Sequence, residues 1–227
     1  MDSIKEEVLS ANKWIVDKGL VELTWGNVSA IDKDSQIIYI KPSGVQLDNI
    51  ISDDIAAIDL SGQHIGGLKP SVDTPTHIAL YKEFPGIGCV IHTHSKYSTI
   101  FAQSGQPIPC LGTTHADYFY GSIPCIKHPQ KEEVQQDYEL NTGKIICAHY
   151  LNNDINYKQV PACTVMGHGV FVWGKDIQDA LQNAYVLEII AEMAYKTLLI
   201  NPSATLADYV LDKHFLRKHG DNKYYGQ

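Results

Sequence analysis

The apolar residues of this chain follow a helical period in some segments and a strand period in others. Over residues 2–18 they recur every three or four positions, which predicts a helix that ends at Gly19. The most regular helical pattern covers 176–199 and places its apolar residues along one stripe. Thr74 followed by Pro75 predicts the start of another helix, with the threonine as N-cap. This helix and three more are expected over 74–84, 96–103, 132–138 and 204–216.

Short runs rich in β-branched residues predict the strands. A turn at 32–35 joins the first two into a hairpin. Residues 106–125 are expected to be irregular, and 144–150 fit either a strand or a helix. Because several strands are joined by short turns, the pattern predicts an α/β fold in which helices pack on a mostly antiparallel or mixed sheet. The predicted strands cover 25–31, 36–40, 55–60, 89–93, 162–166 and 170–173.

The composition limits the class of protein. A length of 227 residues with 44% hydrophobic and 19% charged residues is typical of one globular domain with a sizeable core. The formal net charge of −8 and the lack of any run of lysine or arginine beyond Arg217-Lys218 argue against a nucleic-acid surface. The five cysteines are widely spaced, which argues against a disulfide framework and a zinc ribbon. With a polar start and no long apolar stretch, neither a signal peptide nor a membrane span is expected, and the protein is expected to be cytoplasmic.

The candidate metal ligands are three histidines. His92 and His94 are two residues apart at the end of a predicted strand, so their side chains point to the same face. His168 lies far downstream between Gly167 and Gly169, which let the backbone approach closely. Three imidazoles with one position left open are typical of a catalytic metal site, and they suit zinc and other divalent transition metals. The alternative is that His92 and His94 are ordinary half-buried histidines of a strand.

Asp73 and several loops extend this candidate site. Asp73 stands at the start of the predicted helix 74–84, where it is either a helix cap or a carboxylate close to the metal ion. The loops pair small or hydroxyl residues with turn formers and could present backbone N–H groups to a phosphate, although each is also a common turn. Ser71 precedes a helix N-terminus, which favours an anion. The loop residues are Gly26, Asn27, Lys41, Pro42, Ser43, Gly44, Pro70 and Ser71.

The acid/base candidates lie outside these loops. Asp117 is in a predicted loop, where an aspartate is usually solvated or caps a helix. Tyr224 and Tyr225 are in a polar C-terminal tail, and such tails are usually disordered. This tail also contains the two tyrosines and follows a basic stretch at 214–219. It therefore has more side-chain surface to bury than most tails.

Longer motifs resemble the class II aldolase and adducin family, and within it the L-ribulose-5-phosphate 4-epimerases. The resemblance runs from about residue 5 to the last residue. The wider family shares the paired histidines and the later one, whereas HADYFYG at 115–121, KHFLRKHG at 213–220 and the YYGQ ending are similar to the epimerase branch. The remaining motifs are LTWGNVS at 23–29, IKPSG at 40–44, DTPTH at 73–77 and IHTH at 91–94.

The resemblance implies a fold and a metal centre. The fold would be a single three-layer α/β/α domain over 1–227 with a mostly antiparallel central sheet, assembled as a homotetramer with active sites at the subunit interfaces. The metal centre would hold Zn²⁺, with Mn²⁺ or another divalent transition metal as the alternative. Its implied ligands are His92, His94 and His168, with Asp73 at the same site.

The resemblance also implies roles for the other candidates. Asp117 and Tyr225 match the family's acid/base residues, and Tyr225 would come from a neighbouring subunit. The family usually has a second serine where this chain has Val72, so one phosphate contact through a hydroxyl is expected to be lost. The residues that match the substrate and phosphate loops are Gly26, Asn27, Ser43, Gly44, Ser71 and Val72.

The implied reaction interconverts two pentulose 5-phosphates, L-ribulose 5-phosphate and D-xylulose 5-phosphate. Because C4 is not next to the carbonyl, its inversion requires the C3–C4 bond to break and re-form. A metal ion would act as the Lewis acid, and Asp117 and Tyr225 would divide the proton transfers. Both arabinose use and ascorbate or xylulose use employ this reaction.

Two other functions are compatible with the family. A class II sugar-phosphate aldolase would cleave the bond without re-adding the fragments, and an adducin-like binding module would have no activity. Asp73 favours the epimerase because the related aldolases have glutamate at that position. The three intact histidines argue against the binding module.

Overall fold

One sheet lies between two layers of helices. The structure is a computed structural model that describes residues 3–221, 223 and 224. The strands of these residues are β1 (Asn27–Asp32), β2 (Ile37–Ile40), β3 (Ala56–Asp59), β4 (His64–Gly66), β5 (Cys89–Thr93), β6 (Cys125–Ile126), β7 (Ala162–Val165) and β8 (Val170–Gly174). The α-helices are α1 (Ile4–Asp17), α2 (Thr74–Glu83), α3 (Lys96–Ser104), α4 (Thr113–Ala116), α5 (Lys131–Gln135), α6 (Tyr138–Asn152), α7 (Ile177–Ile200) and α8 (Asp208–His219).

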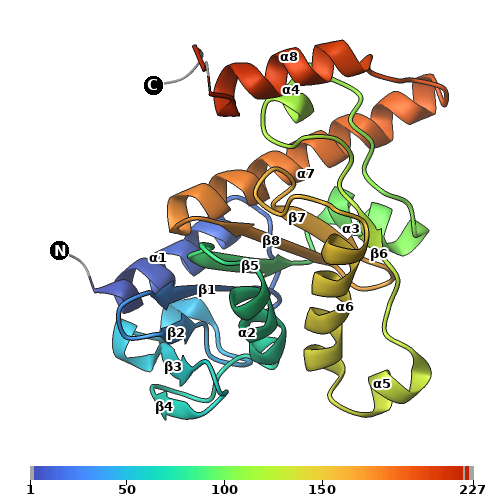
Figure 1. Cartoon of the computed structure of the whole chain (residues 1–227). Helices are drawn as coiled ribbons and strands as arrows, with labels where there is room; N and C mark the ends of the chain where they lie inside the picture. The colour runs from blue at the N-terminus through green and yellow to red at the C-terminus, as the bar shows by residue number, and fades with distance from the viewer. Residues whose placement is uncertain (1–2, 222, 225–227) are drawn as a thin grey trace.

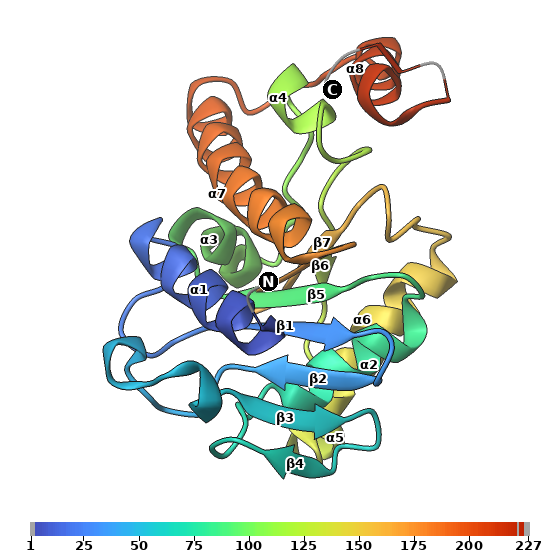
Figure 2. The ribbon, with the colours of Figure 1, turned by 90° about the vertical axis from the view of Figure 1, so that its left-hand side faces the viewer.

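The strands form one sheet in the order β4-β3-β2-β1-β5-β8-β7-β6 (Figure 1). Neighbouring strands are antiparallel except for β6 and β7, which are parallel. Helices α1, α3 and α7 cover one face of the sheet, and α2 and α6 cover the other (Figures 1 and 2). The family resemblance correctly predicts this three-layer arrangement and its mostly antiparallel sheet.

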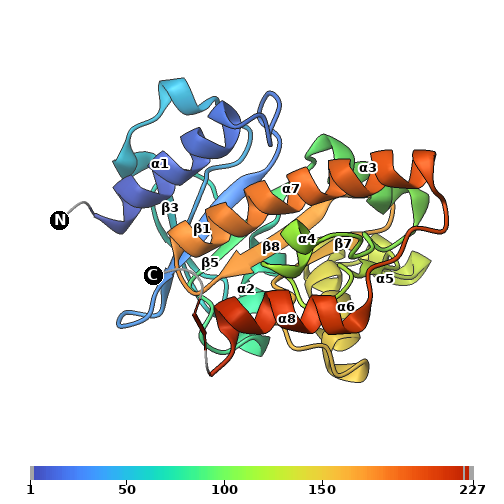
Figure 3. The ribbon, with the colours of Figure 1, turned by 90° about the horizontal axis from the view of Figure 1, so that it is seen from above.

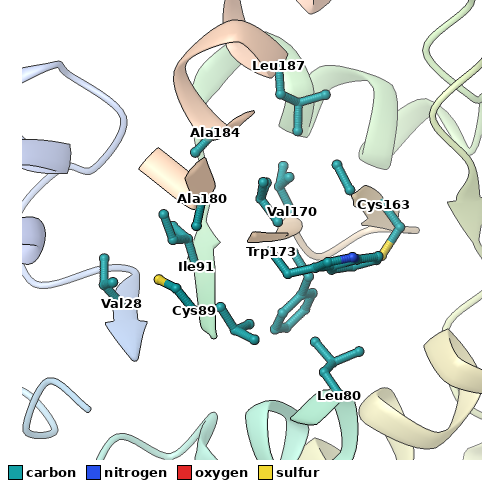
Figure 4. Packing of buried hydrophobic residues seen from close by; sticks show 14 of the residues in the cluster. Val28, Leu80, Cys89, Ile91, Cys163, Val170, Trp173, Ala180, Ala184 and Leu187 are labelled. Atoms are coloured by element: carbon teal, nitrogen blue, oxygen red, sulfur yellow. The ribbon is translucent and has the colours of Figure 1, made fainter. Parts of the chain in front are cut away.

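The core forms where both helical layers meet the central strands. All residues of β5 and β8 are buried, because these strands are covered on both faces. Figure 4 shows Ala184 and Leu187 of α7 on one side of the strands and Leu80 of α2 on the other. The apolar stripe predicted for 176–199 therefore faces the sheet, and it makes α7 the helix that spans the core.

Helices α4 and α8 lie side by side outside these layers (Figure 3). Phe215 is the residue of α8 that is buried, and its ring packs against Tyr120 with centroids 5.1 Å apart. The polar remainder of α8 explains why the sequence pattern places this helix only roughly: it is predicted over 204–216 and observed over Asp208–His219.

Most predicted elements are confirmed, and the differences involve short or polar segments. The segment 106–125, predicted to be irregular, contains α4 and ends at β6. The strand β4 is missed because its residues are exposed or half-buried and lack a hydrophobic pattern. The undecided stretch 144–150 belongs to the helix α6, whereas the predicted helix 132–138 corresponds to the short α5. None of the helices in the described part of the chain is long and apolar enough to cross a membrane.

A buried asparagine fixes α1 to the strand β1. The Asn12 side chain donates to the carbonyl oxygens of Val8 (2.8 Å) and Val28 (3.2 Å), and its Oδ1 accepts from the Val28 N–H (2.8 Å). Asn12 is fully buried. Without this side chain the Val28 N–H would lose its partner inside the protein, where an unmade hydrogen bond is costly.

We predict that Asn12→Ala lowers the free energy of unfolding by about 2–3 kcal/mol, from the lost hydrogen bonds and the cavity. The measurement is urea denaturation, with the exposed neighbour Lys13→Ala as the matched control. If both variants unfold at the same urea concentration, Asn12 does not anchor the helix.

Candidate functional site

The two histidines of the HxH motif lie at the end of β5 and face the same space. Nδ1 of His92 is 2.9 Å from the carbonyl oxygen of Val170, which can only accept, so Nδ1 carries the proton and Nε2 is left as an acceptor. The ring stacks on Phe171 with centroids 4.4 Å apart. Nε2 of His94 lies 3.1 Å from Nε2 of His92. Both imidazoles therefore direct a nitrogen to one point.

The third histidine reaches this point from the turn between β7 and β8. Because β5 pairs antiparallel with β8, Thr93 lies opposite Val170, and the turn falls next to His94. At Gly169 a Cβ would lie 2.7 Å from the Thr93 carbonyl oxygen and 2.8 Å from the His94 ring, so only glycine fits there. Ligand nitrogens of His92, His94 and His168 all lie within 4.8 Å of one another. This cluster could hold a metal ion.

The environment keeps two of these imidazoles uncharged. Partial burial, together with the neighbouring His92, lowers the pKa of His94 to about 4. Burial and the same neighbour lower the pKa of His168 to about 4. Both rings are thus neutral at pH 7, and neutral imidazole is the form that binds metal ions.

Asp73 contributes a carboxylate beside the histidines rather than a helix cap. Its side chain caps no N–H of α2 and instead accepts from Asn27 Nδ2 at 2.8 Å. Burial raises the pKa of Asp73, but His92, His77 and the Asn27 hydrogen bond outweigh this effect, and the pKa lies below its usual value. The prediction that Thr74 is the N-cap is wrong. Thr74 is the first helical residue, and its hydroxyl donates to the carbonyl oxygen of Ser71.

A pocket of about 250 Å³ joins the histidine cluster to the predicted loops. Gly26 comes close to the sheet here: it has φ +77°, and a Cβ would lie 2.7 Å from the His92 carbonyl oxygen. Val72 is 57% exposed at the rim. The pocket is lined by Thr24, Trp25, Gly26, Asn27, Lys41, Pro42, Ser43, Gly44, Ser71, Val72, Asp73, His92, His94 and His168.

Lys41 is a pocket residue that the sequence interpretation noted only as part of a loop. It is buried, and its ammonium group donates to the carbonyl oxygen of Thr24 at 3.0 Å. Burial lowers the pKa of Lys41, while the charge of Asp73 opposes the shift. A single lysine after a strand is normally solvent-exposed, so only its place in the Lys-Pro-Ser-Gly motif could have indicated this role.

Asp117 is not among the residues that line this pocket. It ends α4, and its carboxylate accepts from Arg217 at 2.9 Å and from His214 Nδ1 at 3.0 Å, both on α8. Burial raises the pKa of Asp117, but these hydrogen bonds and the charge of Lys218 outweigh it and lower the pKa. Arg217 and His214 were recognised in the sequence only as part of a basic stretch. Tyr225, the second acid/base candidate, lies outside the described residues.

Comparisons with known proteins agree with this architecture. Residues 6–195 match the family model of the class II aldolase and adducin N-terminal domain. The chain is 48% identical over 229 residues to proteins named L-ribulose-5-phosphate 4-epimerase UlaF from Salmonella paratyphi C (strain RKS4594) and Salmonella typhi, and both chains are covered completely.

Solved structures share the fold at lower sequence identity. An L-fuculose 1-phosphate aldolase is similar with a TM-score of 0.78 and 22% identity, covering 94% of this chain and 95% of that one. The L-fuculose-1-phosphate aldolase from Thermus thermophilus has a TM-score of 0.67 and 19% identity, covering 91% of this chain and 100% of that one. The shared fold agrees with the family model and the full-length relatives. This chain therefore belongs to the class II aldolase and adducin family.

Proposed function

We propose that this protein is a zinc-dependent L-ribulose-5-phosphate 4-epimerase that works as a cytoplasmic homotetramer. The main support is the convergence of three imidazoles with a carboxylate and a lysine in one pocket. This arrangement occurs in a chain that is 48% identical, over its full length, to proteins named for that activity. The pocket would therefore offer a cation site beside an anion site, which is what a phosphorylated ketose requires.

The donor set fits a divalent transition metal. His92, His94 and His168 would hold the ion through ring nitrogens, with Asp73 next to them, and such a set suits Zn²⁺ or Mn²⁺. The bound cation would supply Lewis-acid stabilisation of the negative charge that develops on the ketose oxygens when C3–C4 breaks. The hydrogen bond from Asn27 holds the Asp73 carboxylate in the same pocket.

The other end of the pocket would bind the substrate phosphate. Lys41 brings a positive charge into the pocket, and Ser43 and Gly44 follow it in the same loop. Ser71 lies just before α2, whose N-terminus favours an anion. Val72 would contribute its backbone N–H but no hydroxyl. Held in this way, the cleaved aldehyde fragment could turn its other face to the nucleophilic carbon without leaving the site.

The proton transfers are assigned to Asp117 and Tyr225 from a neighbouring subunit. Within one chain, Asp117 faces α8 and not the pocket that contains the histidines. Helix α8 also leads directly to the C-terminal tail with Tyr225. Since α4 and α8 pack together outside the main layers, one subunit could deliver both residues to the site of the next.

The proposed reaction can be tested directly. The protein loaded with Zn²⁺ should interconvert L-ribulose 5-phosphate and D-xylulose 5-phosphate without accumulating free glycolaldehyde phosphate. Removing the metal with a chelator, or replacing His92 by alanine, should lower turnover by at least about 100-fold, because several kcal/mol of transition-state stabilisation are lost. A coupled assay for D-xylulose 5-phosphate measures the rate, with His64→Ala on the exposed strand β4 as control.

Accumulation of glycolaldehyde phosphate would identify an aldolase instead. A lack of bound metal in protein purified from metal-replete medium, together with no turnover, would favour a non-catalytic binding module.

Hybrid tetramers test whether the site is shared between subunits. Asp117→Asn and His92→Ala should each inactivate the homotetramer, whereas co-expressed mixed tetramers should regain activity. A site that combines an intact histidine cluster from one subunit with an intact Asp117 from the next would arise in roughly a quarter of cases by random mixing in a symmetric oligomer. Turnover of doubly tagged hybrids measures this recovery.

The matched control is the hybrid of His92→Ala with His168→Ala. Both changes damage the same pocket, so this hybrid should stay inactive. If the Asp117 hybrid is equally inactive, Asp117 acts within its own subunit, and if Asp117→Asn alone keeps full turnover, it takes no part in the reaction.

A further inference from the structure

A tyrosine at the start of α6 lies next to the third histidine of the cluster. The hydroxyl oxygen of Tyr138 is 3.4 Å from Nδ1 of His168, and the two rings have centroids 5.9 Å apart. Tyr138 is not among the residues that line the pocket. This contact corresponds to the one that the Val170 carbonyl oxygen makes with Nδ1 of His92.

The fold places Tyr138 there through several independent contacts. Asp137, directly before it, has φ +49° and ψ +48°, a left-handed conformation that few residues other than glycine adopt. The Asn141 side chain donates to the carbonyl oxygens of Glu133 and Gln136 and ties the α5–α6 junction together. The Thr76 hydroxyl of α2 donates to the carbonyl oxygen of Glu139. The first turn of α6 is thereby fixed to the helix that follows Asp73.

His168 needs such a support more than the other imidazoles do. It lies on a turn between two glycines, whereas His92 is part of a buried strand and stacks on Phe171. The ring nitrogen that does not bind the metal usually donates to an oxygen acceptor, which sets both the tautomer and the orientation of the imidazole. The hydroxyl oxygen of Tyr138 has lone pairs and can accept from such an N–H.

We propose that Tyr138 is a positioning residue for the metal centre: its hydroxyl oxygen accepts from Nδ1–H of His168 and holds the ring so that Nε2 faces the cation. This inference rests on the metal centre of the proposed function. It gives a role in shaping the histidine cluster to two features: the left-handed backbone at Asp137 and the hydrogen bond between α2 and α6.

The test is the Zn²⁺ dissociation constant of Tyr138→Phe, measured by competition with a chelator of known affinity. The variant removes one oxygen and keeps the ring beside His168. We expect the dissociation constant to rise about 10- to 100-fold, as for other losses of a partner to a ligating histidine. Thermal unfolding of the metal-free protein should be unchanged. At saturating Zn²⁺, kcat should return to within about twofold of wild type, because the completed site works once it is occupied.

The matched control is Tyr185→Phe, which removes a phenolic hydroxyl from α7, where the ring packs against Trp14. It should leave zinc affinity unchanged. An unaltered dissociation constant in Tyr138→Phe overturns the inference. So does a kcat that stays low at saturating Zn²⁺ with normal affinity, since Tyr138 would then act on the reaction.

The inference and the proposed function can fail separately. If the wild type binds Zn²⁺ but does not act on L-ribulose 5-phosphate, the epimerase assignment fails while the affinity comparison still decides the role of Tyr138. If the wild type is an active epimerase and Tyr138→Phe binds zinc equally well, only the inference fails. If the wild type binds no Zn²⁺, the metal centre and the inference both fail.

Discussion

The antiparallel pairing of β5 with β8 is the interaction on which the site depends. The two strands contribute neighbouring ends, so that His94 just past one strand and His168 just before the other meet although they are far apart in the sequence. The same ladder supplies the Val170 carbonyl oxygen that fixes the His92 ring. Burial of both strands between α7 and α2 makes the register hard to change, because a shift by one residue would turn every side chain to the opposite face.

The electrostatics of the pocket are local and do not follow the net charge of the chain. An overall charge of −8 would repel a sugar phosphate at long range. Inside the pocket, buried Lys41 and the N-terminus of α2 would offset this repulsion at short range. Asp73 keeps its negative charge there, and its carboxylate accepts a hydrogen bond from Asn27. The proposed site would therefore separate a region for a cation from a region for an anion within a small volume.

Features of the fold and of the site that depend on local patterns or on motifs can be predicted from the sequence. Features that depend on contacts between polar segments are missed. The helical stripe of α7 and the buried strands β5 and β8 follow from hydrophobic period, and the histidines converge as their motifs indicate. Lys41 and Tyr138 could not be assigned, because a lysine after a strand and a tyrosine at a helix start have no periodic signal. Their placement arises from burial beneath a loop and from the packing of α6 against α2.

The ion pair at Asp117 bears on how the proposed proton transfers divide. A carboxylate that accepts from both Arg217 and His214 has a lowered pKa and remains ionised near neutral pH. An ionised carboxylate can accept a proton but has none to donate, so in one direction of the proposed reaction Asp117 would remove the C4 hydroxyl proton, and in the reverse direction it would return that proton. In the direction in which Asp117 accepts the proton, the donor would be the other acid/base candidate, Tyr225. Both Arg217 and His214 lie on α8. The helix that leads to the C-terminal tail would therefore also set the charge state of Asp117.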